Sequence, residues 1–149
     1  MVNDMLLFAV GSVGRIARKI GDKNVRAIGL TSAQLRILFF LEEKDNVCQH
    51  DIENEFSMSR SAVSGMLDGM ESDGLIVREK TDDDKRRRII CITDYGKSKL
   101  NAARKQISET EALALSALSG DEKKQLIAML DRIRNVLEES YAENTSFKS

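Results

Sequence analysis

Two groups of polar side chains between residues 59 and 93 could bind a polyanion. The first group lies at the start of an expected helix, which Ser59 caps. The outward face of that helix start carries three further polar side chains: Arg60, Ser61 and Ser64. A helix N-terminus has partial positive charge and free N–H donors that can hold a phosphate, and its outward side chains can reach base edges in a major groove. This group therefore predicts a contact with DNA.

The second group is a basic run at the tip of an expected β-hairpin. The guanidinium of Arg86 can enter a minor groove, where narrow A·T-rich segments concentrate negative potential. Lys85 and Arg87 are candidate phosphate contacts. Asp84 would be repelled by phosphate, so we expect it to orient Arg86 through a bidentate pair. A solvated hairpin tip is the alternative, because Asp82–Asp84 cancels part of the basic charge.

Other chemistry finds little support in the sequence. It has no Gly-rich phosphate loop, no HExxH pattern and one histidine, His50, so we expect neither an enzyme nor a bound metal or cofactor. Cys48 and Cys91 are too few for a disulfide framework, which favours a reducing, cytoplasmic setting. We expect both cysteines to be unreactive residues that only fill space. A redox switch is the alternative, with Cys48 favoured by its place at a helix start.

The net charge of −1 is unevenly distributed. Residues 78–105 carry ten basic and five acidic side chains, a local charge of +5. Residues 42–55 carry six acidic side chains and one lysine, a local charge of −5. A near-neutral protein with one basic segment is compatible with a localised polyanion contact, although charge alone equally allows a solvated loop.

Length and composition indicate one soluble, mainly helical domain. At 149 residues the chain can bury a sizeable core, and the absence of proline favours helix. No apolar run approaches the roughly 18 residues of a membrane span. The N-terminal segment lacks a basic stretch before its apolar residues, so we expect mature sequence rather than a signal peptide.

The apolar spacing predicts an order of elements that would position both polar groups. We expect helices over 4–28, 31–44, 49–56 and 59–73, apolar strands at 75–77 and 89–92, a helix over 93–117 and a last helix after 119. The third and fourth helices, joined by a three-residue turn, have the layout of a helix-turn-helix, and the hairpin after them is a wing.

Local chemistry supports the expected ends and buried faces of these elements. Capping boxes are predicted at Thr31–Gln34 and Ser119–Glu122, an N-cap at Thr93 and a left-handed stop at Gly74. The apolar residues of the second helix expected in the core are Leu35, Leu38, Phe39 and Leu41. Those of the fourth helix are Val63, Met66, Leu67 and Met70.

The long first and last helices carry wide apolar stripes that the small winged core cannot cover. The residues of these stripes include Leu6, Val10 and Val13 in the first helix and Leu126, Leu130, Ile133 and Leu137 in the last. Packing against the same helices of a second copy would bury them, which predicts a homodimer. An intramolecular bundle is the alternative.

Four segments together resemble the MarR family of transcription regulators over essentially the whole chain. Leu30–Gln34 is similar to the family's LTxxQ helix opening, and Gln49–Ile52 to the start of its third helix. Ser59–Gly74 resembles its recognition helix. Asp84–Arg86 and Ile92–Gly96 resemble its DxR wing and LTxxG helix start.

The resemblance implies a single domain, 1–149, that is mainly α with a small β-hairpin wing. It implies a winged helix-turn-helix lobe at 31–93 and long N- and C-terminal dimerisation helices in a stem of 1–28 and 94–149. The family's function would be that of a homodimeric DNA-binding repressor on a pseudo-palindromic operator, released by a small amphipathic or aromatic effector.

The chain departs from the family pattern in its recognition helix. Gly65 and Gly69 stand where relatives usually carry basic residues, so more of the DNA affinity is expected from the wing. The same glycines leave open an alternative function, a winged-helix dimer that acts through protein–protein contacts with weak or lost DNA binding.

Overall fold

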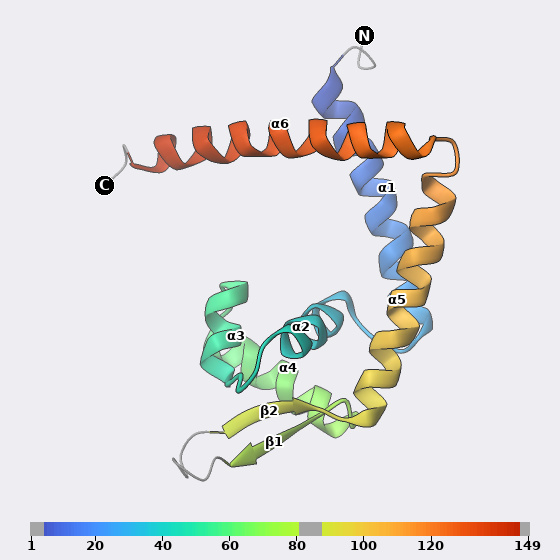
Figure 1. Ribbon diagram of the computed structural model, residues 1–149. Coiled ribbons are helices and arrows are strands. Elements are labelled where there is room, and N and C mark those ends of the chain that lie inside the picture. Colours follow the sequence, from blue (N-terminus) through green and yellow to red (C-terminus); the bar gives the residue numbers. More distant parts are fainter. Residues whose placement is uncertain (1–4, 81–87, 147–149) are drawn as a thin grey trace. The chain divides into compact units, whose positions relative to one another are not determined.

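The computed structural model describes residues 5–80 and 88–146. Within them the chain forms six helices and two antiparallel strands, which confirms the expected fold class of a mainly α protein with a β-hairpin (Figure 1). The elements are α1 (Leu6–Ala27), α2 (Ser32–Glu43), α3 (Gln49–Phe56), α4 (Arg60–Ser72), β1 (Ile76–Lys80), β2 (Arg88–Ile92), α5 (Asp94–Ala114) and α6 (Gly120–Ser146).

The expected helix starts are confirmed by their hydrogen bonds. The Thr31 hydroxyl accepts from the Gln34 N–H at 3.2 Å, and the Gln34 side chain accepts from the Thr31 N–H at 2.8 Å. Ser119 and Glu122 form the same reciprocal pair before α6. The hydrogen bonds from Ser119 also lower the pKa of the Glu122 carboxyl. These contacts satisfy N–H groups that have no partner within the helix.

One hydrophobic core joins α2, α3, α4 and the hairpin. Val63, Leu67 and Met70 on α4 are fully buried, as their spacing predicts, and Met66 is half-buried against them. The prediction for α2 is wrong at one position. Phe40 is the buried aromatic residue, whereas Phe39 is half-buried.

α2 is buried on a broader face than one stripe, since Ile37 also enters the core. Its hydrophobic spacing therefore did not decide between the two adjacent phenylalanines. A further difference concerns α5, which ends at Ala114 rather than near Ala117.

The hairpin leaves α4 through a tight turn and returns into α5 (Figure 1). Gly74 has a φ of +72°, the left-handed conformation that stops the helix. The two strands pair from Ile76 opposite Ile92 to Lys80 opposite Arg88. The Val47 carbonyl accepts from the Ile90 N–H at 2.8 Å, so the segment before α3 is bonded to the outer edge of β2.

The junction between the hairpin and α5 is closely packed. The Thr93 hydroxyl caps α5 by accepting from the Gly96 N–H at 3.0 Å, and it donates to the Gly74 carbonyl at 2.6 Å. A Cβ added to Gly96 would overlap the Leu75 carbonyl oxygen and lie 2.7 Å from Cγ2 of Ile92. Glycine is therefore required there by space and not by its φ angle.

The chain divides into two compact units, Met1–Ser108 and Glu109–Ser149. The first contains the helix-turn-helix, the described part of the wing and α1. The core of this unit also includes Val25 at the end of α1 and Leu100 and Ala103 on α5. The second unit contains the end of α5 and all of α6.

Candidate nucleic-acid interface

The helix-turn-helix is held together at the turn between α3 and α4. Ser57 ends α3 in the left-handed conformation, with a φ of +50°. The Gln49 side chain donates to the Glu53 carboxylate at 2.9 Å and to the Arg60 carbonyl at 3.3 Å. Met58 is half-buried and packs against the core. These contacts fix the start of α4 relative to α3.

The polar start of α4 faces solvent. The Ser59 hydroxyl accepts from the Ala62 N–H at 3.3 Å, which confirms the expected cap. Arg60 and Ser61 are exposed, whereas Ser64 is half-buried. The first turn of α4 carries no acidic residue, so nothing in it opposes the partial positive charge of the helix end. The buried side of the same helix holds this polar start outward.

Gly65 and Gly69 are exposed on α4, and a Cβ at either position would meet no atom within 4 Å. The structure therefore has room for larger side chains at both positions. The absence of long basic residues from this face is a property of the sequence and not a packing requirement.

The proposed contacts at the wing tip lie outside the described residues. They are Asp84, Lys85, Arg86 and Arg87. The strands that lead to them are described, and both end in exposed basic residues, Lys80 on β1 and Arg88 on β2. The hairpin thus carries basic charge at the end of its ladder.

Part of the basic charge counted from the sequence is neutralised within the first unit. On β1, Nη1 of Arg78 lies 2.7 Å from Oδ1 of Asp68 and 3.1 Å from Oε2 of Glu71. The Arg104 guanidinium pairs with the Glu42 carboxylate, which raises the pKa of Arg104. Sequence reasoning missed the Arg78 pairs, because they depend on how the turn at residue 74 folds the strand back along the helix.

The two cysteines are both partly buried but lie in different surroundings. Cys91 on β2 is half-buried, and burial raises the pKa of its thiol, followed by the charge and hydrogen bond of Glu79. Cys48 precedes α3, where its backbone N–H donates to the Asp51 carboxylate at 2.8 Å. His50 is exposed, with Nδ1 lying 3.5 Å from the Glu53 carboxylate.

Residues 5–80 and 88–146 contain no group of three or more His, Cys, Asp or Glu side chains that could hold a metal ion. In the part of the chain that the structure describes, none of the helices combines the length and apolarity that crossing a membrane requires.

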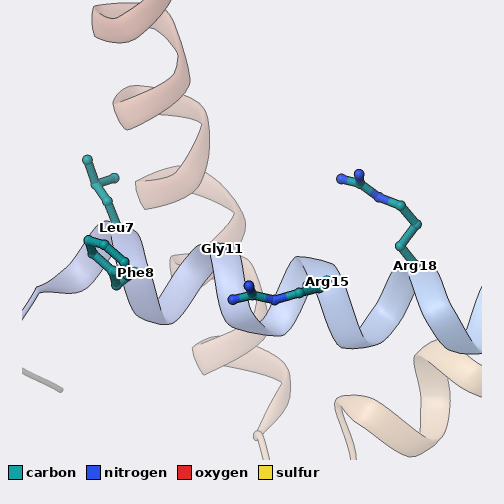
Figure 2. A pocket seen from close by; sticks show the side chains of 5 residues that line it. All are labelled: Leu7, Phe8, Gly11, Arg15 and Arg18. Atoms are coloured by element: carbon teal, nitrogen blue, oxygen red, sulfur yellow. The ribbon is translucent and has the colours of Figure 1, made fainter. Parts of the chain in front are cut away.

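The apolar residues expected at a dimer interface are largely exposed in the single chain. On α1, Leu6 is 64% and Val13 69% exposed, and Val10 is also exposed. A hollow of about 490 Å³ on this helix is lined by Leu7, Phe8, Gly11, Arg15 and Arg18. Figure 2 shows how these residues lie along α1. α1 therefore presents large apolar side chains to solvent, interrupted by arginines.

α6 presents a similar surface within the second unit. Leu126, Leu130 and Leu137 are exposed, and Ile133 is half-exposed. A hollow of about 450 Å³ on α6 is lined by Met129, Arg132, Ile133, Val136 and Leu137. Two helices with large exposed apolar side chains are typical of surfaces that another chain covers.

Comparison with known proteins connects this geometry to one family. A profile described as the MarR family matches residues 28–87. The regulator FarR from Neisseria gonorrhoeae, an HTH-type transcriptional regulator, is 30% identical over 112 residues, which cover 72% of this chain and 76% of FarR. The homoprotocatechuate degradative operon repressor of Escherichia coli is 28% identical over 130 residues, covering 87% and 88%.

Solved structures show the same fold. The transcriptional repressor CouR, bound to a 23-mer DNA duplex, superposes with a TM-score of 0.72 at 27% identity, over 89% of this chain and 94% of CouR. Staphylococcus aureus MepR, a regulator of the multidrug efflux pump MepA, superposes with a TM-score of 0.79 at 24% identity, over 89% and 98%.

Proposed function

Because the chain belongs to the MarR family of transcription regulators, we propose that it is a homodimeric repressor that binds a pseudo-palindromic DNA operator. It acts as a regulator and not as an enzyme. The observation that carries the proposal is the arrangement of α4. Val63, Leu67 and Met70 on its apolar face are fully buried in the core, and its capped start carries exposed Arg60 and Ser61 with no acidic residue in the first turn.

That arrangement suits the major groove of a duplex. The N–H groups at the start of α4 hold a phosphate, and Arg60, Ser61 and Ser64 contact base edges or phosphates. The wing supplies the second contact. In this proposal Arg86 enters the minor groove, Asp84 orients it, and Lys85 and Arg87 hold phosphates. The DNA-bound structure of CouR, a relative at 27% identity, supports DNA as the partner.

The exposed apolar residues of α1 and α6 support the dimer. We propose that residues 1–28 and 94–149 form the stem that pairs two chains, while residues 31–93 form the DNA-binding lobe. Two lobes then read the two half-sites of one operator, since a two-fold symmetric dimer matches a pseudo-palindrome. Such a dimer acts on DNA in the cytoplasm.

We also propose that a small amphipathic or aromatic molecule releases the protein from DNA. The name of the E. coli relative, which is 28% identical, connects that protein to homoprotocatechuate degradation. Homoprotocatechuate is therefore a suitable first probe, and release of bound operator in its presence is the expected result. Retention of the complex with this compound and with other aromatic acids would contradict the effector part alone.

A gel shift on DNA upstream of the protein's own coding sequence tests the proposal. The wild-type protein should form a saturable complex that excess unlabelled site, but not random DNA, displaces. If a dimer makes about 6–8 phosphate contacts, a plot of log K against log salt concentration should have a slope of about −5 to −7.

A slope near zero would contradict DNA binding. If a dimer forms but no DNA fragment is bound, the protein acts instead through protein–protein contacts. Arg86→Ala separates the two cases, because it weakens a DNA complex and leaves dimerisation unchanged.

A further inference from the structure

Arg78 is the one basic side chain of the described wing strands that points back to α4 in an ion pair. Its side chain is only 16% exposed although it lies on an edge of the hairpin. Nη1 contacts two carboxylates, Asp68 at 2.7 Å and Glu71 at 3.1 Å. In addition, the backbone N–H of Arg78 donates to the other oxygen of Glu71 at 3.2 Å. Three polar contacts therefore join β1 to α4.

These contacts form one attachment because of their spacing. Asp68 and Glu71 are three residues apart on α4 and so lie on the same face of the helix. Glu71 is held by both the side chain and the backbone of Arg78, which restrains the strand in two directions. Because the guanidinium of Arg78 is planar, it also fixes the direction of its contacts with the carboxylates, which a point charge would not do.

The attachment has a counterpart on the other strand at the same level of the ladder. Arg78 is paired with Ile90, and the Ile90 N–H donates to the Val47 carbonyl at 2.8 Å. The hairpin is thus held on one edge to α4 and on the other to the segment before α3. Removal of the first attachment would leave the second as a pivot.

The position of this level determines how far the end of β1 moves. Residues 78–80 span about 7 Å at roughly 3.4 Å per residue, so a 10° rotation about this level displaces the end of β1 by about 1 Å. That displacement is about a third of a hydrogen-bond length, so it is enough to weaken or break a contact with a phosphate.

The ion pair of Arg78 is not fully satisfied. Nη2 of Arg78 is enclosed and has no hydrogen-bond partner among the described residues, although an enclosed donor without a partner is unfavourable. The arrangement also leaves the ion pair with excess negative charge, two carboxylates to one guanidinium.

We propose that Arg78 is a positioning residue that sets the angle of the wing relative to the recognition helix α4 by holding Asp68 and Glu71. The wing contacts its DNA groove only at this angle. The inference rests on the proposed DNA-binding function for its consequence, but the angle itself can be measured without DNA.

The first experiment measures that angle directly. Spin labels are attached at Ala62→Cys on α4 and Lys80→Cys on β1, with Cys48→Ser and Cys91→Ala, and the labelled chain is diluted into unlabelled chain. The distance distribution should be narrow with Arg78 present and should broaden in Arg78→Met, which keeps the length and apolar contact of the side chain. An unchanged distribution would overturn the proposal, whether or not the protein binds DNA.

The second experiment measures the consequence on the full-length protein. Arg78→Met should weaken operator binding by about tenfold or more and should make the salt slope smaller by about 2 per dimer, as expected when each wing loses one phosphate contact. The matched control is Arg104→Met, which removes another arginine–glutamate pair of the same unit, between α5 and α2, and should leave both quantities unchanged.

A third variant distinguishes the effect of wing position from the effect of the carboxylate charges. In Arg78→Met the carboxylates of Asp68 and Glu71 are left bare, and their repulsion of phosphate could itself weaken binding. The triple variant Asp68→Asn, Glu71→Gln, Arg78→Met has no charge at the three positions. We expect it to remain weak with the smaller salt slope. Full recovery of wild-type affinity would show that Arg78 only neutralises charge and would overturn the proposal.

Wild-type binding separates this inference from the proposed function. If the wild-type protein binds no operator, the proposed function fails, and the label distances alone decide the role of Arg78. If it binds and Arg78→Met reduces affinity with an unchanged salt slope, the residue contributes to folding and not to wing position, which would also overturn the proposal.

Discussion

At the scale of single residues, arginines of identical charge have different environments. Arg60 is exposed at the start of α4, Arg78 is enclosed between a strand and a helix, and Arg104 crosses from α5 to Glu42. The contribution of each arginine to DNA binding depends on whether a carboxylate of the same chain already neutralises it. A count of charges along the sequence therefore overstates the charge available to a duplex.

The first prediction compares two arginines proposed to contact DNA. We expect Arg86→Ala to weaken operator binding by roughly tenfold to a hundredfold, because a guanidinium in a narrow minor groove meets concentrated negative potential. Arg60→Ala should cost less, because it removes a contact at the rim of the helix. Titration of both variants at one salt concentration measures the order, and equal or reversed losses would contradict it.

The second prediction concerns the thiol of Cys91. Because burial and Glu79 raise its pKa, less thiolate is present at a given pH, so Cys91 should react more slowly with a thiol reagent at pH 8 than a free cysteine does. Glu79→Gln should accelerate the reaction roughly threefold, as it removes the neighbouring charge. The measurement uses a Cys48→Ser background, and an unchanged rate would argue against this contact.

At the scale of elements, local chemistry sets where each helix begins. Packing sets which side chains fit at each position of the helix. The capping contacts at Thr31, Thr93 and Ser119 all lie where the sequence places them, because a cap depends on residues within three positions. The glycines, in contrast, are present for different reasons at different positions. Gly74 is needed for its φ angle, Gly96 for space, and Gly69 for neither.

The third prediction uses that difference between glycines. Gly96→Ala should lower the free energy of unfolding by about 1–3 kcal/mol, because its Cβ overlaps the Leu75 carbonyl and the α5 start must shift. Gly69→Ala is the control, and it should raise stability by up to about 1 kcal/mol, since alanine favours the helix and meets no atom. Urea denaturation measures both, and similar changes in the two variants would be inconsistent with the packing at residue 96.

At the scale of the whole molecule, each compact unit leaves apolar surface uncovered. Leu6 and Val13 on α1 are more than half exposed, as is Leu137 on α6. Burial of apolar area stabilises association by about 25 cal/mol per Å², so such surfaces favour pairing of chains. A second copy is the economical cover, because each copy supplies the same two helices.

The fourth prediction tests that pairing. Val13→Glu and Leu137→Glu should each shift the protein from dimer to monomer in sedimentation experiments, since a carboxylate would be buried without a partner. The control is Lys19→Glu, which introduces a glutamate on another face of α1 and should leave the dimer intact. Dimers that persist in both apolar-face variants would point to a different interface.

Sequence patterns determined the elements and their order, because these depend on neighbours along the chain. The third helix was predicted at its observed ends, 49–56, and Val63, Leu67 and Met70 were predicted to be buried because one helix face repeats every three or four residues. Pattern could not choose between Phe39 and Phe40, since a helix buried on a broad face has no single stripe. It also could not show that Gly96 lies against Leu75.

The sequence by itself therefore determined the fold class, the helix starts and the polar outward face of α4, all of which follow from local spacing. Only the tertiary structure decided which charged residues are paired. Arg78 and Glu71 are seven positions apart, in a strand and a helix, and no period of either element brings them together. They meet because the left-handed turn at Gly74 directs β1 back along α4, and that path depends on the packing of the whole lobe.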